Sequence, residues 1–143
     1  MRHTLSVSTC LVSALLLAGC ATAPAPAPEA AAPTYLDEAT YRPLVNGAYE
    51  LDTYEERETA FDALLARGDL TQDQVAETYL MRGLIRGIYV NDGPFASPYC
   101  AVEDFAKFDA LASPDHPRRE QMADAHAYQT SRYQYFEEPE SCE

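Results

Sequence analysis

Basic side chains are scarce in this chain. Lysine and arginine together number 10, against 23 acidic residues, and the formal net charge is −13. A chain of this charge is repelled by nucleic-acid backbones and by anionic lipid surfaces. We therefore expect no nucleic-acid partner, whereas a basic protein partner is compatible with the composition.

Motifs for catalysis and cofactor binding are also missing. The sequence has no Walker loop, no dinucleotide-binding glycine fingerprint, no paired-carboxylate motif and no paired nucleophile and base. We expect neither enzymatic activity nor a cofactor. The alternative is a small enzyme or metal-binding protein that uses His116, Glu120 and His126, since such side chains bind metals. His116 precedes a proline and His126 lies six residues from Glu120, so this spacing does not favour a metal site.

No apolar run is long enough to cross a membrane, which takes about 20 residues. The run from Leu5 to Ala18 follows Arg2, contains no acidic residue and has the length of a secretory signal peptide. It closes with Leu-Ala-Gly-Cys, ending at Cys20, which resembles the lipobox of bacterial lipoproteins. The resemblance implies cleavage after residue 19, a diacylglycerol on the Cys20 thiol and acylation of the new amino group. The alternative is an uncleaved signal with a chance cysteine.

The segment 20–34 is expected to be a tether. Its alternating alanines and prolines favour extended polyproline II. The 13 residues from Ala21 to Pro33 would then span about 40 Å, at about 3.1 Å per residue. A low-complexity tail, the other interpretation, would also act as a spacer. Ala21, rather than Asp, follows Cys20, and by the lipoprotein resemblance this implies an outer-membrane location. The predicted organisation is thus signal peptide 1–19, lipidated tether 20–34 and folded domain 35–143.

Of four cysteines, two remain for the folded domain. Cys10 lies in the signal peptide and Cys20 in the lipobox, which leaves Cys100 and Cys142. An even pair in an exported protein favours a disulfide. Two free thiols, or a catalytic cysteine, are the alternative.

Local signals predict helices throughout residues 35–143. Thr53-Tyr-Glu-Glu56 and Thr71-Gln-Asp-Gln74 are typical of capping boxes at helix starts. Gly68 is expected to end the first of these helices in the left-handed conformation. Ser97-Pro98 predicts a third start.

A further helix is expected from about Pro117 to Tyr135, and a short one before residue 50. No segment alternates with the period of a strand for long enough to predict one. The sequence therefore predicts an all-α domain of four to five antiparallel helices.

The stretch from Ala76 to Pro114 resembles a tetratricopeptide repeat (TPR), which pairs two antiparallel helices. Tyr79 and Gly83 occupy its aromatic and small positions, and Ala101-Val-Glu-Asp-Phe105 is similar to its second-helix segment. The interval between Gly83 and Ala101 is longer than in the family, and Arg86 stands where tyrosine is usual. The resemblance implies a TPR-like array of helical hairpins, and the alternative is a generic small helical bundle.

The TPR resemblance implies a partner-binding groove between hairpins, whose concave face includes Leu80, Leu84 and Ile88. Arg82 and Arg86 are expected alongside this face. Arginines bind carboxylates bidentately, so Arg82 and Arg86 could hold an acidic group of a partner. Alternatively they are solvated, or paired with Glu77 or with acids of the next helix. Tyr128, Tyr133 and Tyr135 could add a recognition surface or be half-buried packing.

The resulting hypothesis is a lipid-anchored adaptor on the outer membrane, facing the periplasm and binding envelope proteins. A structural lipoprotein without a dedicated partner is the remaining alternative.

Overall fold

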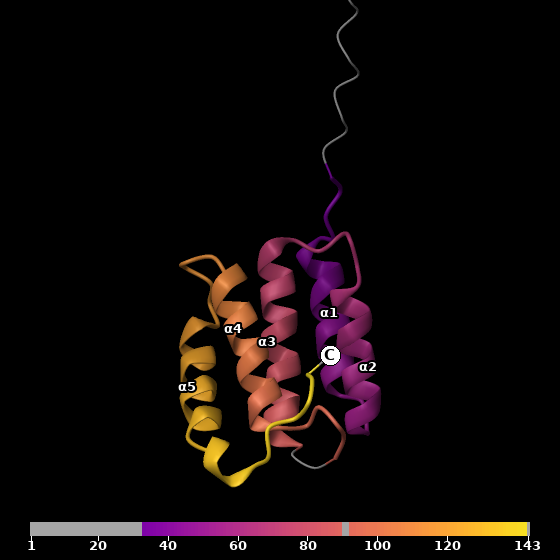
Figure 1. Cartoon of the computed structure of the whole chain (residues 1–143). Coiled ribbons are helices and arrows are strands. Elements are labelled where there is room, and N and C mark those ends of the chain that lie inside the picture. Colours follow the sequence, from indigo (N-terminus) through magenta and orange to yellow (C-terminus); the bar gives the residue numbers. More distant parts are fainter. Residues whose placement is uncertain (1–32, 90–91, 143) are drawn as a thin grey trace, which may run out of the picture. The chain divides into compact units, whose positions relative to one another are not determined.

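The computed structural model describes residues 33–89 and 92–142, so Cys20 and the predicted signal peptide lie outside the described residues. Its elements are α1 (Glu38–Tyr49), α2 (Tyr54–Leu65), α3 (Gln72–Ile88), α4 (Pro98–Leu111), α5 (Arg119–Thr130) and the 3-10 turn η1 (Tyr133–Tyr135). No strand occurs within these ranges, and the prediction of an all-α domain is confirmed (Figure 1).

Helix starts agree with the local signals in the sequence. Both capping boxes form, with Thr53 and Thr71 as N-caps. Ser97 caps α4, whose first helical residue is a proline. The first helix begins at an Asp37 cap, whose carboxylate accepts a hydrogen bond from the Thr40 backbone N–H at 2.9 Å. Side-chain caps satisfy backbone donors that the first turn leaves unpaired, so they fix these four starts locally.

Two helix ends differ from expectation. Helix α2 ends at Leu65 with Ala66 in a right-handed conformation, and Gly68 lies beyond it without the left-handed backbone that was predicted. The last helix is shorter than the predicted 117–135, because α5 stops at Thr130. There the Ser131 backbone N–H donates to both Ala127 and Gln129, and the chain continues into the tighter turn η1.

Helix α3 is the centre of the array. It contacts each of the other four helices, and α4 pairs with it most extensively. In Figure 1, α1 and α2 lie on one side of α3 and α4 and α5 on the other. This order, with α1 against α2 and α3 against α4, is that of stacked helical hairpins, in which α5 follows as a single helix.

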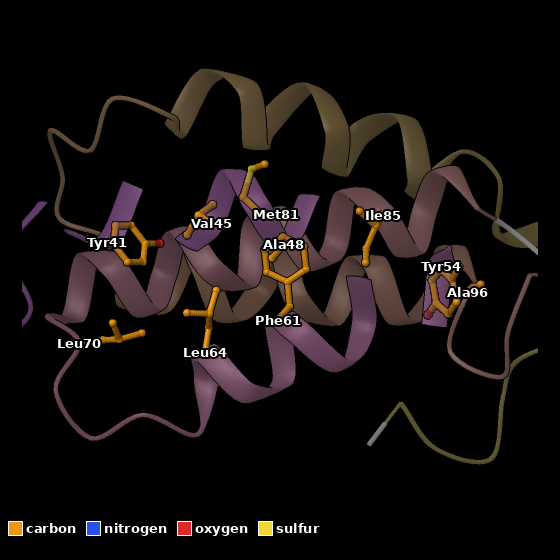
Figure 2. Packing of buried hydrophobic residues seen from close by; sticks show 10 residues of the cluster. All are labelled: Tyr41, Val45, Ala48, Tyr54, Phe61, Leu64, Leu70, Met81, Ile85 and Ala96. Atoms are coloured by element: carbon orange, nitrogen blue, oxygen red, sulfur yellow. The ribbon is translucent and has the colours of Figure 1, made fainter. Parts of the chain in front are cut away.

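The core has two parts on either side of α3. One joins α1, α2 and α3 and is shown in Figure 2, where Phe61 lies at its middle. The other joins α3, α4 and α5 around Phe105 and Phe108, both fully buried. Leu84 packs against both clusters, so α3 is the wall shared by the two halves of the domain.

Gly83 allows α3 and α4 to lie close together. A Cβ at this position would lie 2.7 Å from Cε1 of Phe105 and 3.1 Å from the Ala101 carbonyl oxygen. Gly87, four residues on, lies instead against the Gln129 side chain of α5. Gly83 and Gly87 therefore lie against two different helices.

Replacing Gly83 should test this close packing. We expect Gly83→Ala to lower the free energy of unfolding by about 1–3 kcal/mol, because the added methyl group overpacks the Phe105 ring. Gly47→Ala is the matched control: it also lies within a helix, and nothing lies within 4 Å of its added methyl group. The control should be neutral or stabilise by up to about 1 kcal/mol through helix propensity. Urea unfolding of both variants measures the difference, and equal effects would contradict this account.

The Cys100 and Cys142 sulfur atoms lie 2.02 Å apart, as in a disulfide. Cys100 is fully buried in the first turn of α4, and Cys142 is the last described residue. The bond therefore fastens the tail that follows α5 back onto the start of α4.

We expect loss of this bond to destabilise the domain. In the chain-entropy model a loop of this length contributes about 3–4 kcal/mol, so Cys142→Ser should lower the free energy of unfolding by that order. Dithiothreitol should lower the stability of the unmodified chain similarly and leave that of Cys142→Ser unchanged. If the variant responded to the reductant as the unmodified chain does, the bond would not be the cause.

Candidate interaction site

Most of the residues expected on or beside a concave binding face are buried. Leu80 has no exposed surface, and the exposed fractions of Arg82 and Arg86 are 5% and 1%. Leu84 is partly buried, whereas Ile88 is 60% exposed. Because α3 packs against four helices, little of its length remains open, and only its C-terminal end offers a large exposed apolar side chain. The expected groove along α3 is therefore not an open surface in this structure.

Arg82 is held inside the domain by acids of two neighbouring helices. Its guanidinium donates two hydrogen bonds to the Asp104 carboxylate of α4, from Nε at 3.0 Å and from Nη2 at 2.7 Å. A third bond runs from Nη1 to Asp62 of α2, at 2.5 Å. The Asp104 carboxylate is completely buried, and Asp62 is half exposed.

Arg86, one turn further along α3, completes the same cluster. Its Nη1 lies 3.1 Å from Asp104, and its Nε donates to the Glu58 carboxylate of α2 at 2.9 Å. The alternative that these arginines pair with an acid of the next helix is thus confirmed at Asp104, and acids of the preceding helix α2 pair with them as well. Glu77 pairs instead with Arg42 and Arg118. We call the five side chains of Glu58, Asp62, Arg82, Arg86 and Asp104 the ionic cluster.

Burial and pairing act in opposite directions on the ionic cluster. Burial raises the pKa of the Asp104 carboxyl above its ordinary value, although Arg82 and Arg86 both act to lower it. Burial alone would lower the pKa of Arg82, but its hydrogen bonds to Asp104 and Asp62 outweigh this and raise it. Each charge therefore depends on its neighbours, and removal of one leaves another buried without a partner.

Asp104→Asn should show this dependence. The variant leaves two buried guanidinium groups short of a counter-charge, so we expect the free energy of unfolding to fall by about 3–5 kcal/mol. Asp109→Asn, on the same helix, removes an exposed carboxylate that pairs with Arg119, and it should cost less than about 1 kcal/mol. Thermal unfolding of the two variants provides the measurement. A small effect at Asp104 would show that the cluster does not hold the helices together.

The histidines considered as metal ligands pack separately. His116 is buried edge-on against Phe108, with ring centroids 5.0 Å apart, and its Nδ1 accepts a hydrogen bond from the Arg118 backbone N–H. The ring of His126 lies 6.2 Å from that of Phe105, and Glu120 is exposed. In residues 33–89 and 92–142, no group of three or more His, Cys, Asp or Glu side chains is placed to hold a metal ion.

Exposed apolar side chains gather where α3 and α5 end. Ile88, Tyr128 and Tyr135 are 60%, 61% and 74% exposed. Arg132 connects these segments: its Nη1 donates to the Gly87 carbonyl at 2.8 Å, and its guanidinium lies 5.4 Å from the centre of the Tyr128 ring. Its carbonyl also accepts a hydrogen bond from the Tyr135 backbone N–H. We call Ile88, Tyr128, Arg132 and Tyr135 the distal patch.

The distal patch lies away from the point where the N-terminal segment enters the domain. The Leu36 backbone N–H donates to Asp69, and the Gln74 side chain donates to the Leu36 carbonyl, so the chain enters beside the start of α3. Ile88 is the last residue of α3, and a helix of 17 residues is about 25 Å long. Figure 1 shows the entering segment and the C-terminal ends of α3 and α5 at opposite ends of the domain.

Three of the four residues of the distal patch were candidates for binding from the sequence, although not as one surface. Ile88 was expected in the groove along α3, and Tyr128 and Tyr135 were expected on a recognition surface or half-buried. Both tyrosines are exposed. Arg132 was not predicted, because nothing in the sequence around an arginine that follows a helix indicates which distant carbonyl it binds.

The comparisons with known proteins leave the family open. Searches against family models, curated proteins and solved structures found no match for this chain. Within the described ranges, none of the helices has the length and apolar character needed to cross a membrane.

Proposed function

We propose that this protein is a lipid-anchored adaptor of the bacterial cell envelope, held in the outer membrane through Cys20 and binding an envelope protein in the periplasm. The observation that carries the proposal is the distal patch. It combines exposed tyrosines with an arginine and an isoleucine, and tyrosine and arginine are enriched where binding energy concentrates in interfaces. A TPR-like array of helical hairpins agrees with this role.

The geometry suggests how such an adaptor would work. A lipid anchor on Cys20 would hold the start of the tether at the membrane surface, and the tether would set a reach of about 40 Å. The domain would present the distal patch on the end away from the tether. Arg132 would keep its main-chain bond to α3 and offer its remaining donors and the face of Tyr128 to the partner.

Site-specific photo-crosslinking in living cells tests the proposal. With Ile88 replaced by p-benzoyl-L-phenylalanine in the full-length chain, we expect one envelope protein to be captured under ultraviolet light. Adding Tyr128→Glu should reduce that product by about tenfold, which corresponds to about 1.4 kcal/mol of binding energy. The same photoreactive residue at Ala63, exposed on α2, is the matched control and should capture nothing specific.

The anchor is tested in the same cells. Labelled palmitate should enter the chain and be absent from Cys20→Ser, which should also leave the membrane fraction. Labelling of Cys20→Ser would contradict the lipidation site. Equal capture at Ile88 and Ala63, or capture that Tyr128→Glu leaves unchanged, would contradict the adaptor role.

A further inference from the structure

A second surface of the domain is a groove between α4 and α5, and it rests on a different observation from the distal patch. The groove has a volume of about 580 Å³. Its floor contains Phe105 and Met122, which are buried, and the ring of His126. Its walls are made by exposed alanines, two on each helix: Ala106, Ala110, Ala123 and Ala127.

The hairpin order of the array explains why this groove is open. Helix α2 covers α1, and α4 covers α3, but the described chain continues from α5 only into the turn η1 and the tail that ends at Cys142. α5 therefore has the place of the first helix of a third hairpin. Within residues 33–89 and 92–142 no helix packs on the outer side of α5, and Figure 1 shows α5 at the edge of the array.

Small side chains suit this groove to receive a helix rather than a loop. Where α3 and α4 pack most closely, Gly83 lies against Ala101 and Phe105. The groove repeats that arrangement, with alanines four residues apart on both walls over an aromatic floor. Residues four apart lie on one face of a helix, so each wall offers a flat, closely approachable strip.

The charge around the groove determines which kind of partner helix can bind there. Asp109 lines the groove. Three further exposed acids, Glu103, Glu120 and Asp124, each precede a wall alanine by three residues and therefore neighbour it on the helix surface. Asp109 is already paired, because Arg119 donates to it at 2.7 Å and to the Ala112 carbonyl at 2.6 Å. Lys107 of α4 is directed at the Tyr79 ring of α3. The other three acids give this surface its negative charge. A second copy of this strongly acidic chain would meet like charge here, whereas lysines and arginines would meet opposite charge.

We propose that the groove between α4 and α5 binds an amphipathic helix of a partner protein, with small apolar residues on one face and lysine or arginine along both flanks. The partner's helix packs against α5 as the second helix of a hairpin packs against the first. This inference rests on the proposed adaptor function, for which it adds a second docking surface and the chemistry of its ligand.

The experiment places p-benzoyl-L-phenylalanine at Ala123 of the full-length chain in its own cells, beside the Ile88 chain described above. We expect the Ala123 chain to crosslink to a partner segment that is helical and flanked by basic residues, identified by mass spectrometry of the linked peptide. Glu103→Lys with Asp124→Lys should reduce the product by about tenfold. Asp52→Lys with Glu55→Lys changes the net charge equally at exposed positions outside the groove and should leave it unchanged.

Each other outcome overturns the inference in a distinguishable way. A crosslink at Ile88 without one at Ala123 would support the adaptor function and contradict binding in the groove. A link from Ala123 to a second copy of this chain makes the groove a dimer contact. A linked segment without basic residues, or equal loss in both charge variants, removes the charge selection. Absence of crosslinks at both positions would contradict the adaptor function as well as binding in the groove. Unfolding midpoints in urea, compared among the variants, confirm that each one is folded.

Discussion

The buried carboxylate of Asp104 is the constraint on which the arrangement of helices depends. A charge removed from water is costly unless it is paired and hydrogen-bonded. Two arginines one turn apart on α3 supply that pairing, and they in turn need acids from α2, which Glu58 and Asp62 provide. α2, α3 and α4 are therefore held in one relative position, because a shift of any of them would leave a buried charge without its partner.

The same constraint decides where binding can take place. Arg82 and Arg86 look like ligands for a partner's carboxylate when the sequence is considered alone, but within the domain their donors are directed at the acids of the ionic cluster. On α3 the exposed apolar side chain is that of Ile88, where the helix stops being covered, and on α5 it is that of Tyr128. The proposed binding surfaces therefore lie at the edges of the array, because the centre is occupied by the charges that hold the helices together.

Much of the fold could be predicted because its signals are local. A capping box specifies a helix start within four residues, and Gly83 marks a close approach because no side chain fits there. The face of α3 that would be exposed could not be predicted in the same way. A helix covered by four neighbours shows apolar or small residues on several faces, so Leu80, which is buried, has no local feature that separates it from Ile88, which is exposed. The partners of Arg82 and Arg86 lie 18 to 28 residues away in the sequence, and only the packing of the helices selects them.

The end of the array shows how the domain can be stable while a helix remains uncovered. Stacked hairpins bury their apolar faces against their neighbours, and a terminal unit needs a cap. Here the tail after α5 returns to the first turn of α4, where Cys142 meets Cys100, so a covalent bond performs part of the work of a capping helix. A cap of this kind restricts the chain without covering the alanine walls between Ala106 and Ala127. The exposed carboxylates along those walls oppose self-association at this edge, because a second copy of the chain would bring like charges to the same surface. The disulfide therefore accounts for how the tail is held, while the proposed basic helix would bind at the alanine walls, which no helix of the described residues covers.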